Sequence, residues 1–440
     1  MGKKHSRMKL LNQYTSRTVP GFVNVLGTVT NTATVSLWSQ DNFALYTPTT
    51  RQGDYFRGEM LFNNNTGALW LTITSVAALS NHFGADIVTN SAGRLLLAQN
   101  PETFIYDADG NLTSDGRWTY TWDAENRLVK LAAATGVGPQ ISLQFDYDHQ
   151  GRRIRQRVWN NPTWSGNPTN DVRYVYDGWN LLASLNPASS VRQSYLWGLD
   201  LSGTMQGAGG VGGLLAITDA SQGSHFCAYD GNGNVTALVK ADGSGLAAQY
   251  EYGPFGEPLR ATGPMARANP FRFSTKYQDD ETDLIYYGYR YYKADTGTWP
   301  NRDPLGELAF FQQYARLHKP GELPDQPPVA FNPYAFIDNN PISYTDMDGC
   351  RMTPEGDVAI TPQNRRRPPG KMILIQVPKC TILFVYGHNY VNNFEKKGLQ
   401  WIWNIVPAND ADRKCSYAAV ACCSADVVPN EIPLPGFQNS

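Results

Sequence analysis

A short unit recurs along the chain from Thr103 onward, and it limits the folds that the chain can adopt. Its clearest copy is Phe104-Ile105-Tyr106-Asp107-Ala108-Asp109-Gly110-Asn111-Leu112. An aromatic strand, a turn rich in Asp, Asn and Gly, and a second alternating strand together describe a β-hairpin, which cannot bury its apolar face alone. Stacked hairpins can bury that face, so the repeats predict one continuous sheet. Further copies lie at 120–129, 145–154, 174–182, 226–235 and 250–258.

Composition supports a β-rich protein and argues against nucleic-acid binding by charge. The 440 residues are enough for two or three domains, and 40 Gly and 28 Pro suit short strands joined by tight turns. Charged residues make up 17% and the formal net charge is −2, so no nucleic-acid partner is expected for the repeat sheet. The basic start, Met1 to Arg7, is not followed by an apolar run, so neither a Sec signal nor a membrane span is predicted. The chain is either exported by a dedicated machine or forms the C-terminal piece of a longer surface protein.

Four segments are expected from changes in pattern. Residues 1–100 alternate at 28–38 and 69–74, which predicts an N-terminal β-rich segment. Residues 101–283 carry the repeats, and 284–349 form a distinct aromatic stretch. Five of the six Cys follow Gly349, so 350–440 are predicted to be a different, variable domain.

The aromatic stretch has an unusual combination of motifs. They are Leu284-Ile285-Tyr286-Tyr287-Gly288-Tyr289-Arg290-Tyr291-Tyr292, Arg302-Asp303-Pro304, Asn332-Pro333-Tyr334-Ala335-Phe336, Asn339-Asn340-Pro341 and Asp346-Met347-Asp348-Gly349. Together they resemble the RHS repeat-associated core, and the Tyr-Asp-x-x-Gly-Asn-Leu copies resemble YD (RHS) repeats. This resemblance covers about residues 101–349.

The resemblance implies a β-sheet that spirals into a shell around a C-terminal cargo domain. The family includes bacterial polymorphic toxins, wall-associated proteins, the C component of insecticidal toxin complexes and the animal teneurins. In its toxin members the core closes the shell and acts as an aspartic self-protease, which cuts just after an Asp-Pro-x-Gly-Leu-type motif. Here that motif is Asp346-Met347-Asp348-Gly349-Cys350, without the Pro and with Cys in place of Leu.

Self-cleavage requires one carboxylate to activate water and a second acid to protonate the leaving amine. Asp303 fits the first acidic position of the family, with Arg302 beside it to keep it ionised. Four residues stay open as the second acid, and the cut is expected near Gly349, Cys350 and Arg351. The four are Asp325, Asp338, Asp346 and Asp348. The alternative is a buried Arg302–Asp303 ion pair that closes the core without any cleavage.

Size predicts an open shell. A cargo of about 90 residues needs a surrounding surface of about 5,500 Å². Residues 101–349 can cover at most about 4,000 Å² as strands. The chain alone is therefore expected to form a partial shell, or to be the end of a longer protein.

The tail is predicted to be a small α/β unit. Apolar strands are expected at 372–375, 381–386 and 416–421, with a helix from Tyr390 to Ile405. Gly387-His388 and Ala421-Cys422 resemble the strand ends of caspase-like cysteine peptidases, with His388 as base and Cys422 or Cys423 as nucleophile. A metal site, disulfides, or buried thiols with a capping His stay open as alternatives. The metal site would use Cys380, His388, Cys415 and Cys422.

The sequence thus predicts a mainly β protein, with a spiralling YD-repeat sheet as an open or partial RHS shell and a small C-terminal α/β domain. Its expected function is to present or encapsulate an effector, released by aspartic self-cleavage near 349–351. The alternative is a non-enzymatic surface, adhesion or glycan-binding repeat protein. An immunity protein for the tail and a carbohydrate or cell-surface ligand are the expected partners, with a secreted or cell-surface location. No cofactor or metal is expected, because the turn carboxylates lack the downstream Glu of an EF-hand loop.

Overall fold

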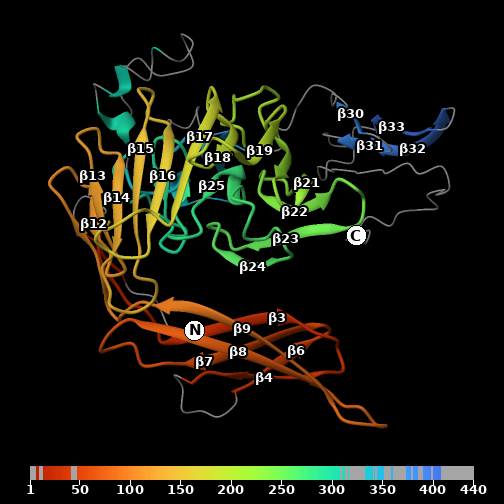
Figure 1. The fold of residues 1–440 in the computed structure, drawn as a ribbon, viewed down its shortest axis with the longest axis horizontal. Helices are drawn as coiled ribbons and strands as arrows, with labels where there is room; N and C mark the ends of the chain where they lie inside the picture. Colours follow the sequence, from red (N-terminus) through yellow and green to blue (C-terminus); the bar gives the residue numbers. More distant parts are fainter. Residues whose placement is uncertain are drawn as a thin grey trace.

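In the computed structural model the repeats form one antiparallel sheet of 14 strands, each paired with its neighbours in sequence (Figure 1). The structure describes residues 6–8, 13–40, 47–307, 310–312, 316, 332–339, 341 and 344–350, and the backbone of five strands between 358 and 407. The terminal strands, β11 and β24, lie at opposite ends of the strand order, so the sheet is not closed. The prediction of a continuous, open repeat sheet is confirmed.

The sheet consists of β11 (Ile105–Tyr106), β12 (Leu112–Ser114), β13 (Trp118–Trp122), β14 (Leu128–Ala133), β15 (Ser142–Tyr147), β16 (Arg153–Trp159), β17 (Asn170–Asp177), β18 (Asn180–Leu185), β19 (Val191–Trp197), β20 (Leu214–Asp219), β21 (Gly223–Tyr229), β22 (Val235–Lys240), β23 (Leu246–Tyr252) and β24 (Pro258–Thr262).

In four of the six repeat copies the Asp closes the turn. One carboxylate oxygen of Asp107 accepts the backbone N–H of Asn111 at 2.8 Å, and the other accepts the Asn111 side-chain amide at 3.1 Å. Gly110 has a φ of +89°, a region that Gly enters without steric cost. Three other turns have the same pair of bonds, from the backbone N–H and the side chain of the residue four positions later to the Asp carboxylate. The pairs are Arg127 with Asp123, Arg152 with Asp148 and Asn234 with Asp230. The Asp and the residue four positions later therefore act as one unit.

The aromatic residue of the repeat fastens neighbouring strands. Tyr147, at the end of β15, donates its hydroxyl to the carbonyl of Leu128 at the start of β14, at 2.6 Å. The ring is partly buried while its hydroxyl is satisfied, which is the usual arrangement for Tyr and Trp in a protein interior. Five more pairs do the same: Trp122–Leu112, Tyr176–Arg153, Trp197–Leu181, Tyr229–Leu214 and Tyr252–Val235.

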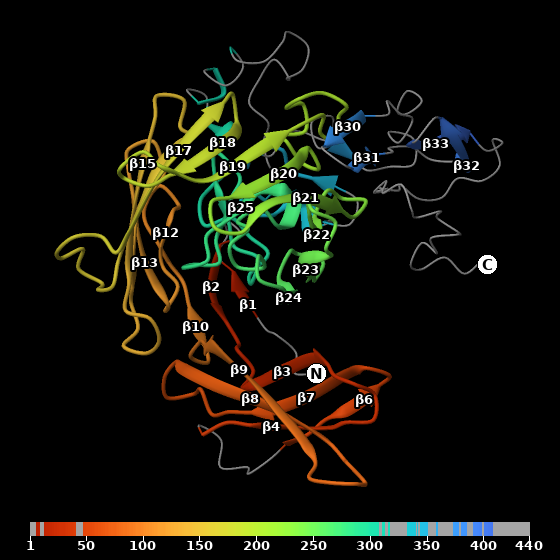
Figure 2. The same cartoon turned by 45° about the vertical axis from the view of Figure 1, so that its right-hand side comes forward.

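The N-terminal strands form a separate β-sandwich beneath the repeat sheet (Figure 1). One layer has the order β3-β7-β6 and the other β5-β4-β8-β9, with Leu37, Met60 and Leu71 buried between them. Strands β1, β2 and β10 make a third small sheet, which lies between the sandwich and the repeat sheet in Figure 2. Their bounds are β1 (Ser6–Met8), β2 (Tyr14–Arg17), β3 (Phe22–Thr28), β4 (Thr34–Trp38), β5 (Thr47–Pro48), β6 (Thr50–Gln52), β7 (Tyr55–Leu61), β8 (Leu69–Leu79), β9 (Ile87–Leu97) and β10 (Glu102–Thr103).

The aromatic stretch fills the concave face of the repeat sheet. Leu284, Tyr286 and Tyr291 pack on β12–β16, while Ile285 and Tyr292 turn toward a second aromatic cluster with Trp299 and Phe336. This alternation follows from the period of a strand, which sends successive side chains to opposite faces. We call residues 264–349 the plug. Its elements are η1 (Phe273–Thr275), β25 (Tyr277–Gln278), β26 (Ile285–Tyr286), β27 (Tyr291–Tyr292), η2 (Pro304–Gly306), η3 (Ile337–Asn339) and β28 (Tyr344–Thr345).

A buried ion pair joins the sheet to the plug. The guanidinium of Arg153 on β16 contacts both carboxylate oxygens of Asp279, at 2.9 and 2.7 Å, and both residues are about 1% exposed. Five aromatic rings surround the guanidinium, at 4.8 to 5.8 Å from their centroids. They are Phe145, Tyr174, Tyr277, Tyr286 and Tyr291.

The predicted helix from Tyr390 to Ile405 is wrong. These residues form an antiparallel hairpin of β32 (Tyr390–Lys397) and β33 (Gln400–Pro407). Val, Ile, Phe, Tyr and Trp in these two segments favour strands, so strand propensity outweighs the helical spacing. The strand pair predicted at 372–375 and 381–386 is antiparallel, as β30 (Ile373–Val377) and β31 (Cys380–Phe384). Strand β29 (Val358–Ala359) pairs with β28.

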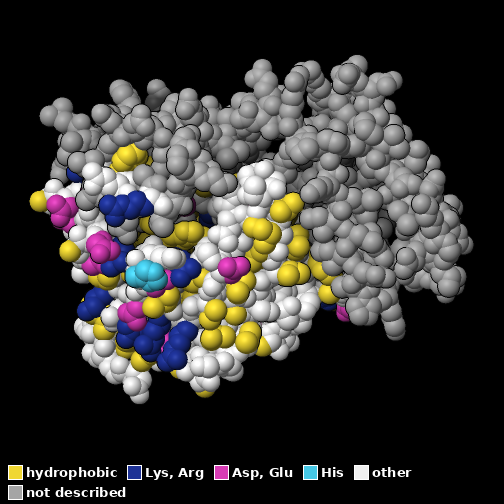
Figure 3. Space-filling view, turned by 90° about the horizontal axis from the view of Figure 1, so that it is seen from above, with side chains coloured by type: hydrophobic (Ala, Val, Ile, Leu, Met, Phe, Trp, Pro, Cys, Tyr) yellow, Lys and Arg dark blue, Asp and Glu magenta, His cyan; other side chains and the backbone are white. Residues whose placement is uncertain are grey.

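The described surface carries charges of both signs. On the face in Figure 3, Lys and Arg side chains gather in one area with Asp and Glu beside them. Arg155 pairs with Asp171 at 2.6 Å and Arg157 with Asp146 at 2.7 Å across adjacent strands. These pairs cancel charge locally, in keeping with the formal net charge of −2.

We predict that Arg153→Met lowers the free energy of unfolding by about 3–5 kcal/mol, because it leaves the Asp279 carboxylate buried without a cation. Urea denaturation should show this as a lower midpoint. Arg155→Met removes a partly exposed pair and should cost about 0–1 kcal/mol. Equal losses in the two variants would contradict the assigned role of Arg153. The double variant Arg153→Met/Asp279→Leu should recover part of the loss.

Candidate active site

Asp303 is positioned by the turn that follows it. Its carboxylate accepts the backbone N–H of Leu305 at 2.9 Å and so caps η2, and Pro304 begins that element. Asp as cap and Pro at the first position are the residues that such an N-terminus favours. The backbone N–H of Asp303 donates to the carbonyl of Pro333 at 3.1 Å. The Asp-Pro dipeptide therefore holds the Asp303 carboxylate in the interior, at 4% exposure.

Two carboxylates meet at the guanidinium of Arg290. One guanidinium nitrogen lies 2.9 Å from Asp303 and 3.9 Å from Asp346. The guanidinium also covers the ring of Trp299 at 4.1 Å, and all three charged residues are nearly inaccessible to solvent. Burial strengthens charge–charge interactions because water no longer screens them.

Asp346 shapes the turn at the end of the plug. One of its oxygens accepts the N–H groups of Asp348 at 3.1 Å and Gly349 at 2.7 Å. Asp348 in turn accepts the N–H of Cys350 at 3.0 Å. Gly349 has a φ of +83°, and an added Cβ would lie 2.9 Å from the Arg290 backbone nitrogen, so only Gly fits there.

Three successive carbonyls of this turn are held by the plug. Lys276 Nζ donates to the carbonyl of Met347, the Tyr289 backbone N–H to that of Asp348, and Arg290 Nε to that of Gly349. The Lys276 ammonium also donates to the carbonyl of Gly209, in the loop between β19 and β20 of the repeat sheet, at 2.7 Å. The peptide bond between Gly349 and Cys350 is therefore fixed, and its carbonyl is polarised by a buried cation.

The surroundings of the turn alter two pKa values. Burial lowers the pKa of Lys276 to about 8, although Asp348, Asp346 and Asp200 oppose the shift. Burial also raises the pKa of the Cys350 thiol well above its ordinary value, and the negative charges of Asp348 and Asp303 add to this effect. A thiol in such a place stays protonated and is a poor nucleophile.

The structure brings together most residues that the sequence singled out at the boundary. Asp303, Asp346, Asp348, Gly349 and Cys350 all lie in one place. The expected role of Arg302 as the buried partner of Asp303 is corrected: Arg302 is exposed and lies over Gly110, and the buried cation is Arg290. Asp325, Arg351 and the side chain of Asp338 lie outside the described residues.

The sequence patterns did not identify Arg290 and Lys276 as residues of the site. Arg290 is the one charged residue in the run from Leu284 to Tyr292, and a lone Arg among aromatics was a signal for a buried cation. Lys276 carries no comparable signal, because its partners are backbone carbonyls far along the chain.

The tail candidates stay predictions. His388, Cys422 and Cys423 lie outside the described residues, as do Cys415 and the side chain of Cys380. Within the described part, no cluster of three His, Cys, Asp or Glu side chains is arranged to hold a metal ion. The same part of the chain contains no helix long and apolar enough to cross a membrane.

An open repeat sheet with a plugged inner face and a polarised boundary turn defines a repeat-sheet protein of the RHS/YD class. The Teneurin YD-shell family model matches residues 75–342, more than half of the chain. The chain belongs to the Teneurin YD-shell family.

Three relatives show how the family is used elsewhere. The tRNA3(Ser)-specific nuclease WapA of Bacillus spizizenii is 32% identical over 57% of this chain and 9% of its own length. Toxin protein Tse5 of Pseudomonas aeruginosa is 26% identical over 46% of this chain and 17% of its own. Toxin subunit YenC1 of Yersinia entomophaga is 24% identical over 63% of this chain and 27% of its own. The chain is thus an RHS-repeat protein related to toxins, and it spans only a small part of their length.

The pKa of Lys276 gives a testable pH dependence. Its folded pKa of about 8 lies below the ordinary 10.5, so the unfolded chain binds more protons between these values. The free energy of unfolding should therefore rise with pH across this window, by about 3 kcal/mol in total. Urea midpoints should show the rise in the wild type and in a surface control, Lys240→Met, but not in Lys276→Met. The same dependence of stability on pH in the wild type and both variants would contradict the lowered pKa of Lys276.

Proposed function

We propose that this protein presents residues 350–440 as an effector and releases them by cutting its own chain at 349–351. One observation carries the proposal. Two buried carboxylates, Asp303 and Asp346, converge on the guanidinium that also binds the carbonyl of Gly349. This arrangement supports an acid–base pair and a cation at the point where the predicted tail domain begins.

The chemistry follows from those contacts. Arg290 keeps Asp303 ionised, so Asp303 takes a proton from water while the oxygen adds to the Gly349 carbonyl carbon. The negative charge that develops on the carbonyl oxygen is stabilised by Arg290, as in an oxyanion hole. In this scheme Asp346 is the protonated member of the pair and donates its proton to the Cys350 nitrogen. The C–N bond then breaks to give a carboxylic acid at Gly349, which ionises, and a new amine at Cys350. The guanidinium contact favours this bond over the next one, between Cys350 and Arg351.

Cys350 acts in this scheme by its backbone nitrogen, not by its thiol. The raised pKa of the thiol supports this assignment, because a protonated thiol would not compete with water as the nucleophile. Asp348 holds the Cys350 N–H at 3.0 Å and so orients the leaving nitrogen.

The relatives support an effector at the C-terminus. Two of the three are named toxin proteins and the third a tRNA nuclease. By the same reasoning we propose a secreted or cell-surface location and an immunity protein that binds the tail. His388 with Cys422 or Cys423 stays the predicted catalytic pair of the tail, and loss of toxicity on His388→Ala is its test.

We predict that the purified chain separates on a denaturing gel into two fragments, the smaller of about 90 residues. Asp303→Asn and Asp346→Asn should each slow the cut by at least about 100-fold, because each loses one proton-transfer group. Mass spectrometry should show that the smaller fragment begins at Cys350. A fragment that begins at Arg351 would place the cut one bond later.

The matched control is Asp279→Asn, another buried carboxylate paired with a buried Arg. It should fold less stably but still cut. A single full-length band from the wild type would contradict the proposal and favour a non-enzymatic surface or glycan-binding protein.

A further inference from the structure

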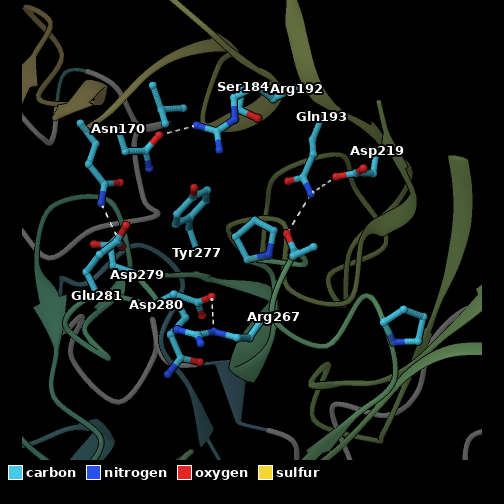
Figure 4. A pocket seen from close by; sticks show the side chains of 16 residues that line it. Asn170, Ser184, Arg192, Gln193, Asp219, Arg267, Tyr277, Asp279, Asp280 and Glu281 are labelled. Carbon is cyan, nitrogen blue, oxygen red and sulfur yellow. Dashed lines mark hydrogen bonds and ion pairs between the residues drawn. The ribbon is translucent and has the colours of Figure 1, made fainter. Parts of the chain in front are cut away.

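A polar pocket of about 450 Å³ lies between the inner face of the repeat sheet and the plug (Figure 4). Its upper wall is formed by strand residues, among them Asn170, Arg192 and Gln193, and its lower wall by the turn that carries Asp279 and Glu281. Tyr277 lies between the two walls in the view. The volume is in the range of small-molecule sites, and no residue of the proposed cleavage site lines it.

Three carboxylates follow one another in the lower wall, and two of them have cations. Asp279 binds Arg153 at 2.7 Å, and Asp280 binds Arg272 at 2.6 Å. Among the described residues no Lys or Arg forms an ion pair with Glu281; its nearest partner is the Gln156 amide at 3.4 Å. Burial raises the pKa of Glu281, and the charge of Asp279 raises it further. A positive group in the pocket would relieve this cost.

Gln278 provides a second, independent sign of a ligand. Its side chain lines the pocket and is 3% exposed, and its Oε1 has no hydrogen-bond partner. A buried acceptor without a donor costs free energy, and native structures contain few of them. Glu281 and the Gln278 Oε1 atom are both acceptors, so the lower end of the pocket favours a ligand group that donates several hydrogen bonds. A primary ammonium has three donors and a positive charge.

The upper wall has a different chemistry. Arg192 donates to Asn170 Oδ1 at 2.8 Å, and Gln193 donates to Asp219 at 2.9 Å. Ser184 adds a hydroxyl to the same wall. Donors and acceptors thus alternate along this side, and a hydroxyl group, which both donates and accepts, can bind to either.

We propose that this pocket binds an amino sugar, with its ammonium at Glu281 and Gln278 and its hydroxyls along Asn170, Ser184 and Arg192. The site does not depend on self-cleavage, because it shares no residue with the boundary turn. It would give the shell a carbohydrate-recognition function in addition to its carrier role.

Calorimetric titration of the full chain with glucosamine, at a slightly acidic pH that keeps its amine charged, tests the proposal. Glucosamine should bind at least about tenfold more tightly than glucose or N-acetylglucosamine, which have the hydroxyls but no charge. It should also bind at least about tenfold more tightly than ethylamine, which has the charge but no hydroxyls. No binding, equal binding of glucose, or equal binding of ethylamine would overturn the proposal.

Variants test which residues of the pocket bind glucosamine. Glu281→Gln should remove the preference for glucosamine over glucose, and Gln278→Met should weaken glucosamine binding. The matched control is Asp283→Asn, a carboxylate that follows the same turn but lies outside the pocket, and it should bind like the wild type. Circular dichroism checks that each variant is folded, and Gln278→Met decides the question if Glu281→Gln does not fold. Unchanged glucosamine affinity in the folded variants would overturn the assignment.

Discussion

The contact between Arg153 and Asp279 holds the two halves of the architecture together. The repeat sheet supplies the cation and the plug supplies the carboxylate, and five aromatic rings exclude water from both. Because each charge would be costly to bury alone, the pair favours the packed arrangement over separated halves. It thereby stabilises the plug against the sheet, while the boundary turn is also held by its own bonds, such as that from Lys276 to the Gly209 carbonyl.

Much of the fold could be predicted from the repeat unit because its physics is local. Asp107, Gly110 and Asn111 make their turn within five residues, so sequence alone reveals it. The hydrogen bond from the Tyr147 hydroxyl to the Leu128 carbonyl joins two adjacent strands, and no sequence pattern showed which carbonyl the hydroxyl would bind. In the tail, residues 390–405 have spacings that also suit a helix, and strand propensity decided the outcome.

The candidate site was predictable where its residues belong to recognisable turn motifs. Asp303 stands beside a Pro that fixes its turn, and Asp346 opens an Asp-x-Asp-Gly turn. The partner of Asp303 was not predictable from proximity in sequence: Arg302 is adjacent but exposed, whereas Arg290 lies 13 residues away and is buried. Burial and tertiary contact select the cation, and both arise only once the plug has packed.

We propose that Arg290 polarises the Gly349 carbonyl at the proposed point of cleavage. The most direct test is the rate of self-cleavage in Arg290→Lys, which keeps the charge but loses the planar fork that reaches both carboxylates and the carbonyl. We expect Arg290→Lys to stay intact and Arg302→Lys to be cut at the wild-type rate. Cleavage of Arg290→Lys at the wild-type rate, or loss of cleavage in Arg302→Lys alone, would rule out this role of Arg290.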